Sequence, residues 1–337
     1  VCGGSCGVVC PAGKLCEGAC LRKEIDKPIE IRKLQQFAVR QEMNHGMQIL
    51  TNLSATKKAK VACIGSGPAS LACAAKLAKS GYTVEIFEAN AKAGGMLSYG
   101  IPPARLSQEI VDWDIKTVTN LGVKIHLNTR VGTDVSFTEL ESKFAAVFVG
   151  CGLWQGRDIG LAGVELEGVI DAVDFLVAAR ASLGAGVQVA KNVVIIGAGD
   201  TGMDCAATAK LLGAENVTVI CNQEEIPAYH EELEYVQRMG ITVVTKYQPQ
   251  RVIGTNIAEG VFSTHQDGYS ELKLKAEQVI LAVGQIKRED GLPAVVAANG
   301  KVFAAGDVVN GGSTVVEAVK QGKLMAATII EFLAKGE

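Results

Sequence analysis

Short apolar runs, glycine-rich turns and stretches with helical spacing alternate along this chain. The runs at 61–65 (VACIG) and 83–89 (TVEIFEA) flank one helical stretch, and those at 192–197 (NVVIIG) and 216–221 (NVTVIC) flank another. Short, almost wholly apolar runs are typical of parallel strands that are buried on both faces. The pattern therefore predicts two βαβ units that begin about 130 residues apart in the sequence.

Each unit is closed by a further apolar run, at 145–152 (AAVFVGCG) and at 278–285 (QVILAVGQ). A third run at 301–309 (KVFAAGDVV) leads into an amphipathic helical stretch at 314–334. If this last strand and helix return to the first unit, the chain is an α/β protein with two Rossmann-like dinucleotide-binding domains, one inserted in the other. The expected boundaries are 58–165 plus 286–335 for the outer domain, 166–285 for the inserted domain and 1–50 for a small helical segment at the start.

The composition excludes several classes of protein. Hydrophobic residues make up 48% of the 337 residues and charged residues 20%, with a net charge of -3, so we expect no nucleic-acid partner. No apolar run reaches eighteen residues and the first residues lack the regions of a signal peptide, so we expect no membrane partner and a cytoplasmic location. The 38 glycines suit phosphate-binding turns and point to nucleotides as ligands.

The ten cysteines fall into two groups. Four of the five in the first twenty residues have the spacing C-x3-C-P-x4-C-x3-C, ahead of a helical stretch at 29–47 and a polar linker at 51–60. Stable disulfides are unlikely in a cytoplasmic protein, so this group predicts metal binding. The other five form no CxxC pair, and we expect buried small side chains at Cys63, Cys73, Cys151, Cys205 and Cys221.

The first glycine-rich turn, GSGPAS, follows a strand and opens a helix. Gly65 and Gly67 allow a tight turn and a close approach of a pyrophosphate to the helix N-terminus. Ser70 replaces the third glycine of the usual fingerprint, and serine is small enough to be tolerated there. Glu88 follows the next strand, 23 residues after Gly65, where an acid accepts hydrogen bonds from the adenosine ribose.

The residues around this turn favour FAD over NAD as its ligand. Glycines 94 and 95 would let the backbone approach an extended diphosphate and flavin, and Arg105 offers a cation. Asp307, after a late strand, could bind a ribityl hydroxyl, and the helix that begins near Thr314 would direct its positive end at the flavin. The expected FAD-binding set is Gly65, Gly67, Pro68, Ala69, Ser70, Glu88, Gly94, Gly95, Met96, Leu97, Arg105, Val131, Gly306, Asp307, Thr314, Val315 and Val316.

The second fingerprint, GAGDTG, keeps all three glycines and is expected to hold NAD(P). At the end of its second strand, a 2′-phosphate would require arginines, and the sequence has Asn222 and Gln223 instead. These amides can bind a free ribose but cannot neutralise a phosphate, so the sequence favours NADH over NADPH. The expected set is Gly197, Ala198, Gly199, Asp200, Thr201, Asn222, Gln223, Ala282, Val283 and Gly284.

Six motifs in order then resemble a known family: CGVVCPAGKLCEGAC, IEIRKLQQFA, GSGPASLACAAKLA, GGMLSYGIPPARL, GAGDTGMD and AAGDVVNGGSTVVEAV. They are similar to the flavin subunit of glutamate synthase and to the N-terminal half of dihydropyrimidine dehydrogenase with its small bacterial subunit counterpart. The resemblance covers nearly the whole chain. It implies that a nicotinamide gives hydride to FAD, which then feeds single electrons through [4Fe-4S] clusters to a separate, larger catalytic or electron-accepting subunit.

The resemblance also implies cluster ligands. The positions of Cys10, Cys16 and Gln35 match ligands of one cluster, and Cys20 matches a ligand of the other. The family takes its remaining ligands from an upstream cysteine segment, so we expect either a fragment, ligands from another polypeptide, or incomplete clusters. Cys2 and Cys6 match no family ligand, and we expect them to pack, although they could substitute.

Three alternatives to this electron-input oxidoreductase stay open. The chain could be the flavin subunit of an electron-bifurcating or transhydrogenase complex. A pyridine-nucleotide disulfide reductase shares the two-domain plan but needs a redox CxxC pair, which the sequence lacks. A scaffold that binds FAD only for structure is disfavoured by the intact fingerprint at Gly197. In the electron-input oxidoreductase the cofactors carry the chemistry, so no catalytic acid or base is expected.

Overall fold

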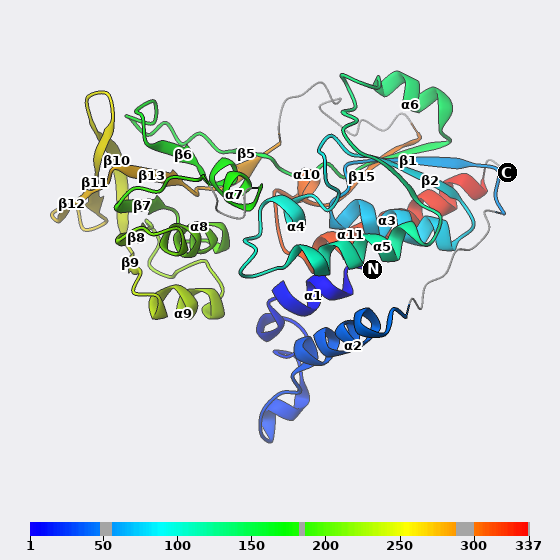
Figure 1. The fold of residues 1–337 in the computed structure, drawn as a ribbon, viewed down its shortest axis with the longest axis horizontal. Helices are drawn as coiled ribbons and strands as arrows, with labels where there is room; N and C mark the ends of the chain where they lie inside the picture. The colour runs from blue at the N-terminus through cyan, green and yellow to red at the C-terminus, as the bar shows by residue number, and fades with distance from the viewer. Residues whose placement is uncertain (48–55, 182–185, 288–299, 336–337) are drawn as a thin grey trace. The chain divides into compact units, whose positions relative to one another are not determined.

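The computed structural model describes residues 1–47, 56–181, 186–287 and 300–335 (Figure 1). The chain divides into two compact units. The first unit comprises Val1–Ser98, Pro103–Leu153 and Lys287–Glu337, and the second comprises Tyr99–Pro102 and Trp154–Ile286.

The first unit is built on a parallel sheet of five strands in the order β15-β4-β1-β2-β3. In this order the strands are β15 (Val302–Ala304), β4 (Ala146–Val149), β1 (Lys60–Ile64), β2 (Thr83–Phe87) and β3 (Lys124–His126). Successive residues of β1 point to opposite faces, so Val61 and Cys63 join one apolar core while Ala62 and Ile64 join another. Burial on both faces explains why this strand is continuously apolar in the sequence.

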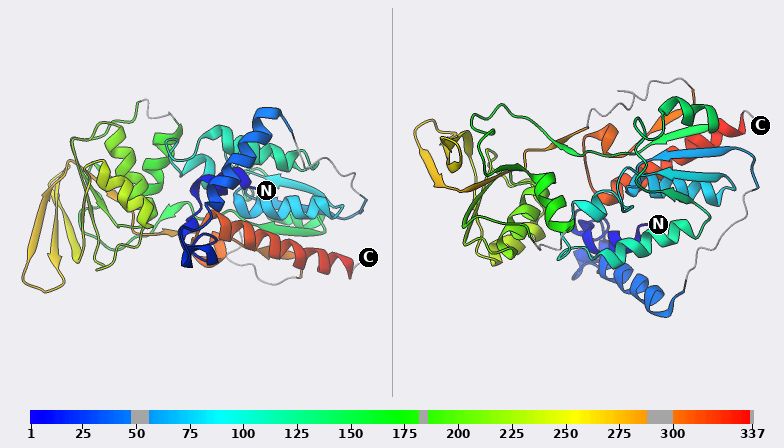
Figure 2. Two further views of the ribbon diagram at one scale, coloured as in Figure 1. Left: turned by 90° about the horizontal axis from the view of Figure 1, so that it is seen from below. Right: turned by 45° about the horizontal axis from the view of Figure 1, so that its top comes forward.

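Helices cover both faces of the first sheet (Figures 1 and 2). One face packs against α3 (Pro68–Lys79), α5 (Gln108–Thr119) and α11 (Val315–Ala334), and the other against α6 (Phe137–Lys143). A Cβ on Gly322 of α11 would stand 2.1 Å from the carbonyl oxygen of Ala69, so glycine permits the close contact between α11 and α3. The end of the chain therefore returns to the first βαβ unit, as the split-domain fold requires.

The second unit has its own parallel sheet of five strands in the order β6-β13-β7-β8-β9. These are β6 (Val169–Asp171), β13 (Gln278–Leu281), β7 (Asn192–Ile196), β8 (Asn216–Ile220) and β9 (Thr242–Val244). One face carries α7 (Ala172–Ala181), α8 (Asp200–Leu211) and α9 (His230–Arg238). The other face is covered by an antiparallel sheet of β10 (Tyr247–Gly254), β11 (Ala258–His265) and β12 (Glu271–Lys275), which the sequence analysis did not predict.

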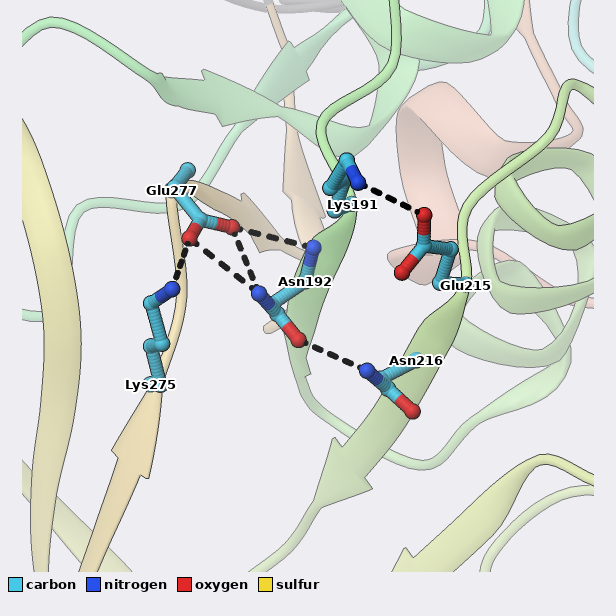
Figure 3. A network of polar contacts seen from close by, with 6 residues as sticks. All are labelled: Lys191, Asn192, Glu215, Asn216, Lys275 and Glu277. Atoms are coloured by element: carbon cyan, nitrogen blue, oxygen red, sulfur yellow. Dashed lines mark hydrogen bonds and ion pairs between the residues drawn. The ribbon is translucent and has the colours of Figure 1, made fainter.

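Polar side chains tie together the strand starts of the second sheet (Figure 3). The Asn192 side-chain amide donates to both carboxylate oxygens of Glu277, at 3.1 and 2.9 Å, and its carbonyl oxygen accepts from Asn216 at 2.8 Å. Lys275 Nζ lies 2.9 Å from Glu277. The network joins the first residues of β7 and β8 to Glu277, which directly precedes β13. It lies at the amino-terminal ends of the strands, opposite the glycine-rich turn.

The segment before β1 is helical and belongs to the first unit. It contains α1 (Gly3–Val9), two short 3₁₀ turns at Ala12–Lys14 and Leu21–Glu24, and α2 (Ile31–His45). Asp114 of α5 is buried, and its carboxylate accepts bonds from Gly4 N at 3.0 Å and from Ser5 N and Oγ at 2.7 Å each. This carboxylate caps α1 and fixes it against the first unit.

The structure confirms the predicted fold class: two Rossmann-like α/β domains, one inserted in the other, with a helical segment in front. One strand was predicted too long, because the run at 301–309 is extended only to Ala304 and Asp307–Asn310 forms the short helix α10. Part of the predicted linker, residues 51–55, lies outside the described residues.

Among the residues that the structure describes, no helix combines the length and apolar character needed to cross a membrane.

Candidate functional site

The first glycine-rich turn has the geometry that a phosphate-binding turn needs. Gly65 has a φ of 83° and donates its N–H to the carbonyl oxygen of Phe87 at 2.8 Å, and a Cβ there would stand 2.9 Å from the carbonyl oxygen of Gly150. Only glycine fits this approach. Ser70 is accommodated because the residue facing it is Gly150, whose carbonyl accepts from Ser70 Oγ at 3.4 Å. The departure from the usual fingerprint is therefore matched by a glycine directly after the neighbouring strand β4.

Glu88 is buried at the end of β2, as expected for the acid of the fingerprint, but its carboxylate already has donors within the protein. One oxygen accepts from Ser66 N at 2.9 Å and from Ser66 Oγ at 2.5 Å, and the other accepts from Asn90 N and Nδ2 at 2.9 Å each. The Ser66 hydroxyl also accepts from Gly94 N at 3.0 Å. Ser66 thus links the acid, the turn and the following loop, a role that sequence analysis missed.

The loop after Glu88 lies directly against this turn. A Cβ on Gly95 would stand 2.9 Å from Cα of Gly67, so the predicted glycines 94 and 95 belong to the same site as the fingerprint. Met96 begins α4 (Met96–Tyr99) and is half-buried, whereas Leu97 is fully buried. Arg105 is half-buried further along the first unit. Val131 is buried in the core cluster that contains Phe87.

The last strand brings the remaining predicted residues to the same turn. A Cβ on Gly306 would stand 2.9 Å from Cβ of Ala69, and Gln321 of α11 accepts the Gly306 N–H at 2.9 Å. The Thr314 hydroxyl caps α11 by accepting from Glu317 N at 3.3 Å, with Val315 and Val316 as the first helical residues. Asp307 therefore lies beside the first turn of α3.

Two features of this region fit a bound FAD. Asp307 Oδ1 is one of the few buried side-chain oxygens in the described ranges without a hydrogen-bond partner, and burial raises the pKa of this carboxyl. A buried acceptor without a donor is costly, so a ligand hydroxyl is the expected partner. The nearest atom to a Cβ on Gly67 would be 3.9 Å away, so the N-terminus of α3 is open to a phosphate.

The second turn repeats the plan in the second unit. Gly197 has a φ of 110°, and a Cβ there would stand 2.2 Å from the carbonyl oxygen of Ala282. A Cβ on Gly202 would stand 2.0 Å from the carbonyl oxygen of Gly197. At Gly199 a Cβ would meet nothing within 4 Å, which leaves space for a nucleotide diphosphate at the start of α8.

The predicted neighbours of this turn are held by contacts within the second unit. Asp200 Oδ1 accepts from Tyr229 N at 2.9 Å, and the Ala198 carbonyl accepts from Ala228 N at 3.1 Å, so both positions fasten the loop before α9. Thr201 is half-buried. Ala282, Val283 and Gly284 follow β13 beside Gly197, where Ala282 N donates to Ile196 at 2.8 Å.

A cation that sequence analysis missed lies against the loop after β8. Asn222 is not free, because its Nδ2 donates to Gln248 at 3.0 Å. Lys246, from the connection between β9 and β10, donates its N–H to the Gln223 carbonyl at 3.0 Å, and its Nζ lies 2.6 Å from Glu224. No local motif marks Lys246, because only the fold brings it to this loop.

Arg157 is a second missed cation. Its N–H donates to the Gly284 carbonyl at 3.0 Å, and its Cζ lies 3.7 Å from where a Cβ of residue 284 would stand. These contacts place an exposed guanidinium at the carboxyl end of β13, where ligands of parallel sheets bind. The signal available in the sequence was only that Arg157 follows a predicted closing strand.

The predicted cluster ligands lie in the helical segment, but the described chain alone does not form a closed metal cage. Cys10 is half-buried and Cys16 is exposed; burial, then the neighbouring Cys16, raises the pKa of Cys10. Cys20 receives backbone N–H groups, first from Ile29, which lower its pKa. The Gln35 side-chain amide donates to the Gly3 carbonyl at 2.7 Å.

In the ranges that the structure covers, no three His, Cys, Asp or Glu side chains converge as a metal site. Cys2 is buried in the core of the first unit, and Cys6 packs against that core. The other cysteines, Cys63, Cys73, Cys205 and Cys221, are buried as expected, and Cys151 is half-buried. The described residues do not by themselves fit a complete four-ligand cluster.

Comparisons with known proteins agree with this geometry. Residues 59–322 match the family model for pyridine nucleotide-disulphide oxidoreductases, and residues 1–47 match that for dihydropyrimidine dehydrogenase domain II, 4Fe-4S cluster.

Among curated proteins, the NAD-dependent dihydropyrimidine dehydrogenase subunit PreT homolog of Salmonella typhi is 38% identical over 98% of this chain and 82% of that protein. The glutamate synthase [NADPH] small chain of Escherichia coli is 30% identical over 97% of this chain and 80% of that protein. The structure of Mycobacterium tuberculosis FprA in complex with NADPH has a TM-score of 0.73 at 16% identity, covering 83% of this chain and 85% of that one, and so shares the fold. The chain therefore belongs to the pyridine nucleotide-disulphide oxidoreductase family and is an NAD(P)H-dependent flavoprotein oxidoreductase with an N-terminal segment of the 4Fe-4S type.

Proposed function

We propose that this chain is the electron-input subunit of a larger oxidoreductase, and that it oxidises NADH and passes the electrons on to a partner subunit. FAD, when bound, would accept a hydride and release the electrons one at a time. The observation that carries the proposal is Oδ1 of Asp307, which is buried and has no hydrogen-bond partner among the described residues, beside an open helix N-terminus in the first unit. A second open helix N-terminus, at Gly199, provides for a second dinucleotide.

The proposed roles of the residues follow from these positions. Gly65, Gly67 and Pro68 hold the FAD diphosphate at the start of α3, and Asp307 accepts a bond from a ribityl hydroxyl. Glu88 fixes the turn through Ser66 and meets the adenosine ribose. In the second unit Gly197, Gly199 and Thr201 hold the NADH diphosphate, and Ala282–Gly284 with Arg157 line its nicotinamide half. We assign residues 58–165 plus 286–335 to FAD, 166–285 to NAD(P) and 1–50 to iron–sulfur binding.

The test is flavin reduction in the purified protein. The cofactor released by acid should be FAD, and anaerobic NADH should bleach its absorbance. An Asp307→Leu variant should lose FAD more readily on dilution, while Asp134→Leu, in an exposed turn of the same unit, should retain it. Release of FMN, or a flavin that NADH does not bleach, would contradict the proposal.

We further propose that Cys10, Cys16 and Gln35 are ligands of one [4Fe-4S] cluster and that Cys20 is a ligand of another. Support comes from the family match at 1–47 and from the backbone N–H groups around Cys20, which favour its thiolate. The remaining ligands would come from a further cysteine segment, in this polypeptide or in another. Iron and sulfide assays on residues 1–337 should find less than two clusters per FAD, and two full clusters would contradict this ligand set.

The partner is proposed to be a larger catalytic or electron-accepting subunit, in the cytoplasm. Support comes from the curated relatives, which are named as a dehydrogenase subunit and as a small chain. A tagged chain should co-purify with one larger polypeptide that accelerates NADH oxidation. Retention of full turnover with a natural acceptor in the chain alone would argue against a partner.

A further inference from the structure

The loop after β8 is the part of a dinucleotide domain where the adenosine ribose and its 2′-substituent are recognised. In this chain Cys221 stands where an acid would select the free ribose, and no arginine follows it to accept a 2′-phosphate. The loop therefore has neither of the usual determinants. Its charges come instead from Glu224 and Glu225 in the loop and from Lys246, which approaches from the β9–β10 connection.

The backbone holds Lys246 firmly at this loop. Its N–H donates to the Gln223 carbonyl at 3.0 Å, its carbonyl accepts from Gln266 N at 2.9 Å, and the next residue, Tyr247, donates to the Cys221 carbonyl at 3.0 Å. Lys246 also has a φ of 64°, a left-handed conformation that costs a lysine about 1 kcal/mol or more. The surrounding bonds therefore fix the place of this cation against the loop.

The ammonium of Lys246 is paired within the protein. Its Nζ lies 2.6 Å from Glu224 Oε1, and the side chains of Lys246 and Glu224 are 36% and 74% exposed. An exposed ion pair of this kind adds little to stability. Its main consequence is local charge: the pair is neutral, so the loop offers an incoming dianionic phosphate no net attraction.

We propose that Glu224 is a specificity-determining residue that masks Lys246 and thereby makes the enzyme prefer NADH to NADPH. Without the Glu224 carboxylate, Lys246 would present three ammonium donors and a full positive charge to a 2′-phosphate. With it, the phosphate meets an engaged cation and a neighbouring negative charge. This inference rests on the proposed function, because it assumes that NAD(P)H binds at the Gly197 turn.

The test compares kcat/KM for NADPH with that for NADH in flavin reduction. Glu224→Gln should raise the NADPH-to-NADH ratio about tenfold, since charge-assisted bonds to phosphate are stronger than neutral ones. The gain should shrink as ionic strength rises, because the contact is exposed. Glu225→Gln is the matched control: it removes the same charge from the next residue, which is also exposed, and should leave the ratio near that of the native protein.

A second substitution identifies the cation. In Glu224→Gln/Lys246→Gln the ratio should fall back to the native value, and adenosine 2′,5′-bisphosphate should lose the tighter inhibition that it gains in Glu224→Gln. Equal NADPH-to-NADH ratios in Glu224→Gln and Glu225→Gln would overturn the proposal. So would a preference of the native protein for NADPH, or an increase in the ratio that persists in the double variant. A flavin that neither nucleotide reduces would instead contradict the proposed function, and direct binding of the bisphosphate would still decide the role of Glu224.

Discussion

The two glycine-rich turns of this protein have the same backbone conformation. They differ in the contacts around the third fingerprint residue, which is Ser70 in the first turn and Gly202 in the second. Gly65 and Gly197 both have positive φ values, and each donates to the last residue of the neighbouring strand at 2.8 Å. In the second turn, a side chain at Gly202 would collide with the Gly197 carbonyl at 2.0 Å. In the first, Ser70 fits because Gly150 faces it. The third position is thus limited by the carbonyl of its own turn in the second unit, and it faces a glycine of another segment in the first.

The turns differ again at the residue that follows the second strand. Glu88 and Cys221 are structurally equivalent, since each donates its N–H to the adjacent strand at 2.9 Å, Glu88 to His126 and Cys221 to Val244. Glu88 is buried and accepts four hydrogen bonds, whereas Cys221 is a buried thiol that bonds its own loop. The first site is therefore built around a fixed acid. The second site takes its positive charge from Lys246, in the connection between β9 and β10.

The largest effect is expected from exchanging the third residues. Gly202→Ser should destabilise the second unit by about 3 kcal/mol, because the new side chain must displace backbone within a packed turn. Ser70→Gly should cost the first unit about 1 kcal/mol, the usual penalty of glycine in a helix. Urea unfolding followed by circular dichroism measures both. Equal losses of stability would show that the third positions of the two turns are constrained alike.

Removal of the fixed acid should have the next largest effect. Glu88→Ala leaves the donors of Ser66 and Asn90 without their acceptor, so FAD should be held about 1–3 kcal/mol less tightly, roughly 5- to 150-fold in Kd. Ultrafiltration at increasing dilution measures the retained flavin. Glu85→Ala is the matched control on the same strand, where the carboxylate bonds His126 at 2.8 Å instead of the turn. If both variants keep FAD equally, Glu88 has no part in the site.

A smaller and more selective effect is expected at the open glycine of the second turn. Gly199→Ala adds a methyl group where the protein has no atom within 4 Å, so stability should change by less than about 1 kcal/mol. If a diphosphate occupies that space, the KM for NADH should rise about tenfold, equal to 1.4 kcal/mol. Gly13→Ala adds a methyl group to an equally open position in the N-terminal segment and should leave the KM unchanged. An unchanged KM in Gly199→Ala would move the nucleotide away from this turn.

The features that sequence analysis predicted are those encoded by neighbouring residues. Apolar runs gave the parallel strands, and glycine spacing gave the two turns, because both depend on short segments of chain. The split of the outer domain was also predictable, since a third strand and an amphipathic helix follow the inserted unit. These features fix the fold class that the structure confirms.

The features that were missed depend on contacts between distant segments. Lys246 and Arg157 reach the second unit's turn region only through strand pairing and loop packing. Ser66 contacts Glu88, which lies at the other end of the βαβ unit in the sequence. The antiparallel sheet at 247–275 was missed because its first strand carries Pro249 and register shifts, which break the alternation typical of strands. Long-range placement of polar residues has no periodic signal in the sequence.

The smallest effect is expected at the opposite edge of the second sheet, where the network of Figure 3 ties the strand starts together. Hydrogen bonds from Lys275 first, and then from Asn192, lower the pKa of Glu277 to about 2. A carboxyl whose pKa is lower in the folded than in the unfolded state stabilises the fold above the unfolded pKa, about 4.3, and loses that effect as the pH falls towards 2.

Glu277→Gln should therefore lower the urea midpoint of the second unit at pH 7, and the difference from the native protein should shrink between pH 4.5 and 3. Because the Glu277 side chain is 40% exposed, solvent screens the interaction and the shift in the urea midpoint should be small. FAD retention by the first unit should not change. Lys275→Met removes the main cause of the lowered pKa and should reduce the pH dependence of the Glu277→Gln difference. A difference that stays constant down to pH 3 would mean that Glu277 titrates alike in the folded and unfolded chain, and that this edge is held by its strand pairing alone.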